Sequence, residues 1–204
     1  DPKEQDLREK RHEYADEYWR MRQRKGMTLN QARRIMRDRA YFGSMMLLHD
    51  EADVFLSGIT RSYPDALRPP LEIIGKQSKL LAGLYIVVTK KGPIFFADTT
   101  INKNPSEDDL FEITLLTIEA VKRFGIKPIV SLLSYSNFGS SKDEETNKIN
   151  RVVKALQKKY PSLLIDGEMQ ANFALNKNKR LGLFPFSKLA DKKVNTLIFP
   201  NLVS

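Results

Sequence analysis

Residues 129–140 read IVSLLSYSNFGS, a short apolar run with β-branched side chains that opens into a polar turn. The same pattern recurs at Leu163–Ile165 before Asp166–Gln170, and at Leu197–Phe199 before Asn201. Apolar runs of this length and composition are typical of buried strands. Because ligands of open α/β sheets bind beyond the carboxyl ends of the strands, the three segments together predict one polar cleft.

Helical patterns alternate with these strands in the second half of the chain. Residues 106–124 and 142–160 are expected to form helices, and a further helix is expected from Gln170. Residues 84–89 and 94–97 flank a Lys-Lys-Gly-Pro turn and predict a hairpin. This alternation is typical of an α/β fold, so we expect a mostly parallel sheet with the hairpin at its edge.

The first 75 residues are dominated by helical patterns. Tyr63 begins a helix that should kink or restart at Pro69 and Pro70, since proline lacks an amide donor and clashes with the preceding turn. Residues 54–59 are expected to form a short strand or a tight segment. Helices are also expected over residues 4–24 and 28–37, and residues 41–48 are expected to be helical or turn-like.

At 204 residues and 41% hydrophobic content, the chain is long enough to bury one or two cores. The pattern changes near Lys76, and we place the domain boundary there. Residues 1–75 are interpreted as the helical part of a first lobe, and residues 76–204 as a complete second α/β lobe.

Composition limits the chemistry that the chain can carry. The absence of cysteine excludes disulfides, thiolate metal sites and cysteine nucleophiles, and it fits a reducing cytoplasm. His12 and His49 have no partners spaced as metal ligands, so we expect no metal site. No apolar run approaches the roughly 20 residues that span a bilayer, and the charged amino end does not resemble a signal peptide. The chain does not begin with Met, so we expect a fragment of a longer protein.

The three polar turns resemble those of the phosphate acetyltransferase and phosphate butyryltransferase family. Its members show L-S-[FY]-S-x-x-G-S, D-G-E-x-Q and F-P-[DN]-L turns in this order. One such match would be a weak signal, but seven matching segments in order, from about Tyr18 to Leu202, are a strong one. The four further segments are Arg22–Gly26, Tyr41–Met46, Ala52–Asp53 with Ser57–Gly58, and Leu67–Pro69.

Within this family, the chain is most similar to the carboxy-terminal domain of the large bacterial NADP-dependent malic enzymes. The segments that carry this likeness are Tyr18–Gly26, Thr60–Asp65 and Ser136–Gly139. Stand-alone acetyltransferases usually have His-Ser/Thr-Thr-Ala in place of residues 61–65, and often Thr-Lys in place of Asn137 and Phe138. The resemblance implies a domain that binds acetyl-CoA and regulates its parent enzyme. NADP and a divalent metal would belong to the catalytic domain of that parent.

The resemblance also implies an architecture. Family members have two three-layer α/β/α lobes with the ligand cleft between them, and they dimerise through the second lobe, so we expect a homo-oligomer. The first lobe is expected to be incomplete, because the family's strands before Asp1 and its closing segment after Ser204 are absent. The family's catalytic Ser-Arg pair and Asp follow the F-P-N-L turn. We therefore assign no catalytic residue and do not expect these 204 residues to complete acyl exchange.

Exchange of an acyl group between phosphate and CoA needs cationic and amide donors. Arg22 and Arg68 occupy the positions of the two family arginines that contact CoA, and the planar fork of arginine suits phosphate. The alternative role for each arginine is an exposed ion pair, which contributes little to the stability of a protein. We predict that both bind CoA.

The serine-rich turn is the second part of the predicted site. Ser140 precedes a helix whose amide end attracts anions, but a serine there could equally be an ordinary helix cap. For Asp166 and Glu168 we favour hydrogen bonds to backbone amides over an acid–base role. The candidates for binding CoA or phosphate in the turn are Ser134, Ser136, Asn137, Gly139 and Ser140. The other residues expected to line the cleft are Asp53, Ser57, Asp166, Glu168, Gln170, Asn195 and Asn201.

The net charge of +9 favours anionic partners. Between Arg20 and Arg39, eight basic residues accompany a single acid, Asp38. Most of these basic residues are interpreted as a solvated helical face, and one or two would suffice for the phosphates of CoA. A nucleic-acid interface is the weaker alternative, because no nucleic-acid-binding module accompanies the patch.

Three hypotheses follow. The first is a regulatory module of a cytoplasmic NADP-dependent malic enzyme that binds acetyl-CoA. The second is a fragment of an active phosphate acyltransferase. The third, ranked last, is a basic nucleic-acid-binding protein.

Overall fold

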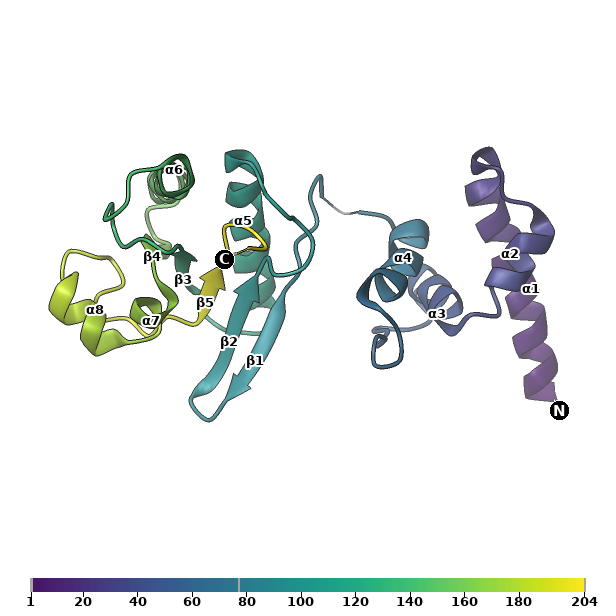
Figure 1. Cartoon of the computed structure of the whole chain (residues 1–204). Helices are drawn as coiled ribbons and strands as arrows, with labels where there is room; N and C mark the ends of the chain where they lie inside the picture. The colour runs from purple at the N-terminus through teal and green to yellow at the C-terminus, as the bar shows by residue number, and fades with distance from the viewer. Residues whose placement is uncertain (1, 77, 204) are drawn as a thin grey trace. The chain divides into compact units, whose positions relative to one another are not determined.

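The computed structural model describes residues 2–76 and 78–203 of the chain. Two compact units make up the chain, Asp1–Gln77 and Ser78–Ser204 (Figure 1). The division falls beside the position expected near Lys76. That the first unit is an incomplete lobe stays a prediction. No helix within the described ranges is long and apolar enough to cross a membrane.

The first unit is helical. Its elements are α1 (Pro2–Arg22), the 3₁₀ turn η1 (Gln23–Lys25), α2 (Leu29–Ile35), α3 (Arg39–Leu48) and α4 (Tyr63–Ile73). Their apolar faces meet in one core that includes Tyr14, Tyr18, Met36, Met45 and Ile73. Gly26 ends η1 with a left-handed φ of 83°, and Thr28 forms a capping box with Gln31 at the start of α2. A glycine stop and a capping box therefore separate η1 from α2.

Two expectations for this unit each offered two alternatives, and the structure contradicts one alternative of each. Residues 54–59 form no strand, and Leu56 and Ile59 are 89% and 104% exposed, so the burial that a strand needs is missing. Helix α4 runs through Pro69 and Pro70 without a restart. Pro69 and Ile73 are buried, and the Ile74 amide still donates to the Pro70 carbonyl at 2.9 Å. Tertiary packing of α4 thus outweighs the two missing amide donors.

The second unit contains a five-stranded sheet in the order β1-β2-β5-β3-β4. The strands are β1 (Tyr85–Thr89), β2 (Gly92–Ala97), β3 (Ile129–Leu133), β4 (Leu164–Met169) and β5 (Thr196–Ile198). Strands β1 and β2 form an antiparallel hairpin at the edge, and every other neighbouring pair is parallel. The predicted α/β fold with a mostly parallel sheet and a hairpin edge is confirmed.

Helices cover the two faces of this sheet (Figure 1). They are α5 (Glu107–Arg123), α6 (Glu144–Lys159), α7 (Ala171–Ala174) and α8 (Lys177–Leu183). Leu132 packs in the core beneath α5 and α6, whereas its neighbour Leu133 packs in the core of the opposite face, which also includes Ala174 of α7. Successive residues of a strand point to opposite faces, so each apolar run supplies both cores.

Candidate functional site

The parallel strands β2, β5, β3 and β4 all end at one edge of the sheet. Ser134 follows β3, Gln170 follows β4 and Phe199 follows β5, so the three polar segments predicted from sequence lie at a common edge. A fourth segment, residues 98–100, follows β2. Sequence analysis does not single it out, although an acid after a buried run is the same signal as at Asp166. We call the polar residues after β3 and β4, together with Glu168, the strand-end cluster.

Glu168 is the centre of the strand-end cluster. It is fully buried, and its Oε1 accepts hydrogen bonds from the Gly139 amide at 2.7 Å and the Ser136 hydroxyl at 3.1 Å. The Phe138 amide donates to the Glu168 backbone carbonyl at 2.9 Å. Its second carboxylate oxygen, Oε2, has no hydrogen-bond partner within the described part of the chain. Glu168 therefore holds the serine-rich turn against β4.

Strand β4 is longer than expected and includes Asp166 and Glu168, which sequence analysis assigns to a turn. Asp166 accepts hydrogen bonds from the Ser187 hydroxyl at 2.7 Å and from the Lys188 amide at 2.9 Å. The Gly167 amide donates to it at 3.0 Å. Asp166 thus fixes the segment after α8.

Asp143, rather than a serine, caps the helix that follows the turn. Its Oδ1 accepts a hydrogen bond from the Thr146 amide at 3.0 Å. Hydrogen bonds from the Tyr135 hydroxyl, the Thr146 amide and the Ser141 hydroxyl lower the pKa of Asp143 to about 2. The same bond to Asp143 raises the pKa of Tyr135. A carboxylate thus occupies the amide end of α6, and binding of an anion by Ser140 stays a prediction.

The remaining predicted residues separate into two groups. Gln170 donates from its amide to Asn137 Oδ1 at 2.9 Å and from its side chain to the Tyr135 carbonyl at 2.7 Å, which ties β4 to the turn. Asn201 donates to Glu145 at 3.0 Å and lies at the strand ends. Asn195 precedes β5 and accepts from the Ile129 amide at the start of β3, at 2.8 Å. It lies at the opposite edge of the sheet and is not part of the strand-end cluster.

A largely apolar cavity of about 320 Å³ opens at the strand ends. Its lining is Leu133, Ser134, Tyr135, Ala171, Phe199 and Val203. The carboxyl ends of β3 and β5 and the first residue of α7 therefore surround it. Ser134 is the predicted site residue that it contains, whereas the hydroxyls of Ser136 and Ser140 bond each other at 3.0 Å.

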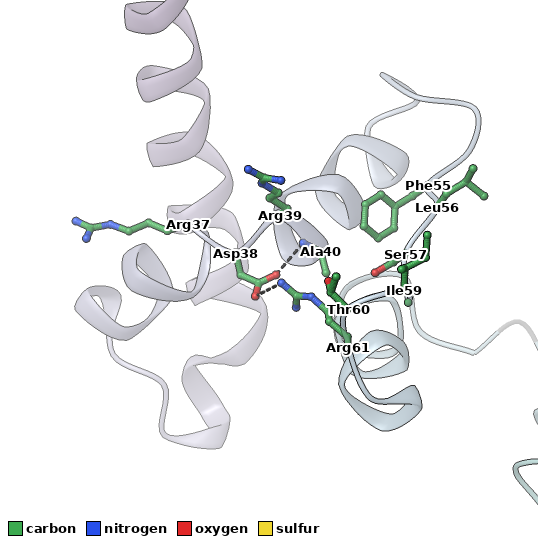
Figure 2. A pocket seen from close by; sticks show the side chains of 11 residues that line it. Arg37, Asp38, Arg39, Ala40, Phe55, Leu56, Ser57, Ile59, Thr60 and Arg61 are labelled. Atoms are coloured by element: carbon green, nitrogen blue, oxygen red, sulfur yellow. Dashed lines mark hydrogen bonds and ion pairs between the residues drawn. The ribbon is translucent and has the colours of Figure 1, made fainter.

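The first unit has a larger pocket of about 720 Å³ around residues 55–61 (Figure 2). Ser57 lines it, as do Arg39 and Arg61, whereas Asp53 is not among its lining residues. Arg61 Nη2 lies 2.8 Å from Asp38 Oδ2. Burial alone would raise the pKa of Asp38, but the hydrogen bonds from Arg61 and the Ala40 amide lower it. Asp38 and Arg61 were not predicted as pocket residues, although Asp38 before a helical pattern is a recognisable cap.

Arg22 and Arg68 both act on one half-buried group of side chains in the first unit, which includes Tyr41 and Glu72. Arg22 Nη2 lies 3.2 Å from Glu72 Oε1, and the Tyr41 hydroxyl donates to Glu72 Oε2 at 3.0 Å. Burial and the bond to Glu72 raise the pKa of Tyr41, and the charge of Arg68 acts against this rise. Arg22 also lines a pocket of about 300 Å³ that includes Lys25. Among the described residues, no group of three or more acidic or histidine side chains could hold a metal ion.

The family model described as phosphate acetyl/butaryl transferase matches residues 2–204. The chain belongs to the phosphate acetyl/butaryl transferase family. It is 38% identical over 188 residues to the NADP-dependent malic enzyme of Haemophilus influenzae, covering 91% of this chain and 25% of that protein. It is 33% identical over 198 residues to the phosphate acetyltransferase of Clostridium acetobutylicum, covering 93% of this chain and 59% of that protein.

Solved structures of the family show the same fold. The EutD phosphotransacetylase from Staphylococcus aureus superposes with a TM-score of 0.78 at 29% identity, covering 94% of this chain and 59% of that chain. The chain thus spans about a quarter of the malic enzyme that it matches and less than two thirds of the acetyltransferases. It is a phosphate acetyltransferase-like domain whose relatives include both kinds of enzyme.

Proposed function

We propose that this domain binds a CoA thioester, acetyl-CoA in the first instance, and regulates an NADP-dependent malic enzyme of which it forms a part. Membership of the acyltransferase family supports CoA as the ligand. The likeness to a malic enzyme over 91% of the chain supports the regulatory role. The cytoplasmic location and the homo-oligomer expected from sequence stay predictions.

The observation that carries the proposal is the apolar cavity beside Ser134 at the strand ends. Its volume of about 320 Å³ is at the small end of the range for ligand pockets. It suits the acetyl end of a thioester better than a whole CoA molecule. The apolar walls, Leu133 and Phe199, would bury the methyl group, and the Ser134 hydroxyl would lie close to the carbonyl.

Residues at which the chain departs from stand-alone acetyltransferases support regulation over catalysis. Arg61 is held by Asp38 at 2.8 Å, so its charge is partly neutralised within the protein. Phe138 packs against the rings of Phe184 and Phe186, with centroids 5.0 and 5.1 Å away. These side chains are integrated into the fold and do not present free groups for acyl transfer.

Calorimetric titration with acetyl-CoA tests the binding. We expect Arg22→Ala and Arg68→Ala each to weaken binding by about 1–3 kcal/mol, as for other hydrogen bonds to charged groups. Arg24→Ala is the matched control, since Arg24 is exposed and lies in the same basic region. Unchanged affinity in both test variants would remove the two arginines from the site. An absence of heat with the unaltered protein would contradict the binding itself.

A second candidate function is acyl exchange between an acyl phosphate and CoA. The superposition on a phosphotransacetylase, with a TM-score of 0.78, favours it. Formation of acetyl phosphate by the intact parent protein separates the two candidates. We expect no turnover above background, together with a change in malate oxidation when acetyl-CoA is added. Robust acetyl phosphate formation would favour acyl exchange over regulation as the function.

A further inference from the structure

A separate cavity of the first unit, of about 320 Å³, is lined by basic side chains. We call it the arginine groove. Its lining residues are Arg8, Arg11, His12, Arg33 and Arg37. It contains neither Arg22 nor Arg68, and it lies in a different unit from the strand-end cluster. The residues proposed to bind CoA therefore do not explain the presence of this groove.

Helical spacing explains why these side chains converge. Arg8, Arg11 and His12 are three and four residues apart in α1, so they share one face of that helix. Arg33 and Arg37 are also four residues apart, at the end of α2 and just after it. The two helices are joined by a core in which Ala32 and Met36 pack with Tyr14, Ala15 and Tyr18. The shared core fixes the backbone from which the basic side chains project.

Two arginines of the groove, Arg11 and Arg33, have contacts that leave most of their charge in place. Arg33 Nη2 lies 3.8 Å from Asp16 Oδ1, with both side chains nearly half exposed. Arg11 lies over the Phe42 ring at 6.0 Å from its centroid, which orients the guanidinium without cancelling its charge. Neither Arg11 nor Arg37 forms an ion pair with a carboxylate of the described residues. In Figure 2 the Arg37 side chain points away from the other labelled pocket residues.

We propose that the arginine groove binds a phosphate-bearing small molecule. Guanidinium groups that approach from two helices match an oxyanion with several acceptor oxygens better than a single planar carboxylate. The cations repel one another within a Debye length of about 8–10 Å, and a multiply charged anion relieves this repulsion. A volume of about 320 Å³ accommodates one or two phosphate groups. The site is independent of the proposed acetyl-CoA site.

Titration with inorganic pyrophosphate tests this proposal. The protein used carries Arg22→Ala and Arg68→Ala, so that the proposed CoA ligands cannot contribute. Adding Arg11→Ala with Arg37→Ala should weaken pyrophosphate binding about tenfold or more, because two charge-assisted contacts are lost. Adding Arg20→Ala with Arg24→Ala removes the same net charge at exposed positions outside the groove, and binding should change less than about threefold. Equal thermal unfolding midpoints will show that both variants are folded.

The outcomes separate the possible ligands. Binding of ADP with an affinity similar to that of pyrophosphate supports the proposal and identifies the phosphates as the recognised group. Pyrophosphate binding weaker than about 1 mM in the starting protein would overturn it. Equal losses in the groove variant and the control variant would also overturn it, since net charge alone would then explain the binding. Tighter binding of a single-stranded oligonucleotide, lost in the groove variant, would assign the groove to nucleic acid instead.

Discussion

At the strand ends of the second unit, polar side chains are hydrogen-bonded mainly to the protein itself. Glu168 accepts from Gly139 and Ser136, and Asn137 accepts from the Gln170 amide. In the arginine groove of the first unit, by contrast, Arg11 and Arg37 have no carboxylate partner within the described ranges. Both regions are polar in sequence, but most strand-end groups bond to one another, whereas two guanidinium groups of the arginine groove have no carboxylate partner among the described residues. Substitutions among the hydrogen-bonded strand-end residues should therefore affect mainly stability, and substitutions of the groove arginines mainly binding.

The largest expected effect concerns Arg180, which is fully buried in the second unit. Its guanidinium donates to the carbonyls of Leu189, Phe173, Ala174 and Lys192. Arg180→Met should lower the free energy of unfolding by about 3–5 kcal/mol, because buried carbonyls lose their donors. Urea unfolding measures this loss. Arg180→Lys keeps the charge but not the forked guanidinium, and it should lose less unfolding free energy than Arg180→Met. Equal losses in the two variants would argue that the multiple hydrogen bonds do not stabilise the fold.

The next effect should come from Glu168. Glu168→Ala leaves the Gly139 amide and the buried Ser136 hydroxyl without their acceptor and should cost about 2–3 kcal/mol. Glu168→Gln keeps an acceptor oxygen and is expected to cost less. Denaturant midpoints of the two variants check this order. If the alanine variant were as stable as the unaltered protein, the strand-end cluster would not be held together by this carboxylate.

A local contact of the first unit should have a smaller effect. The Thr28 hydroxyl accepts a hydrogen bond from the Gln31 amide at 3.3 Å and so caps the start of α2. Thr28→Ala should lower the free energy of unfolding by about 1 kcal/mol, as for other helix caps. Chemical unfolding followed by far-ultraviolet dichroism measures the change. Thr28→Ser, which retains the hydroxyl, serves as the control and should remain close to the unaltered protein.

Substitution of Asp143 should have the smallest effect on the free energy of unfolding near neutral pH, and this effect should depend on pH. Its pKa is lowered from 3.8 to about 2 in the folded protein. A carboxyl group whose pKa is lower in the folded than in the unfolded protein stabilises the fold at pH values above its unfolded pKa. The contribution of Asp143 is therefore present above about pH 4 and is lost as the pH falls toward 2. Asp143→Asn keeps a helix cap but does not titrate. The stability difference between the two proteins should shrink between about pH 4 and 2, and a constant difference would contradict the assignment.

Local signals predicted much of the secondary structure. Strand β3 matches its predicted bounds, and α5 and α6 begin within two residues of theirs, because capping residues and apolar runs act over a few neighbours. Burial was harder to predict. The full burial of Arg180 depends on carbonyls up to twelve residues away, and no spacing pattern announces it. Likewise, Asp166 is directed to Ser187, twenty-one residues along the chain.

By itself, the sequence determined the α/β alternation, the hairpin edge and the order of the polar turns, since these depend on period and on turn chemistry. Only the tertiary structure decided which polar side chains remain free. Asp143 occupies the end of α6 and Glu168 secures the serine-rich turn, whereas the α1–α2 packing gathers Arg11 and Arg37, which form no ion pair with a carboxylate of the described residues. A hydrogen bond or an ion pair depends on distances between residues remote in sequence, and those distances exist only after the chain has folded.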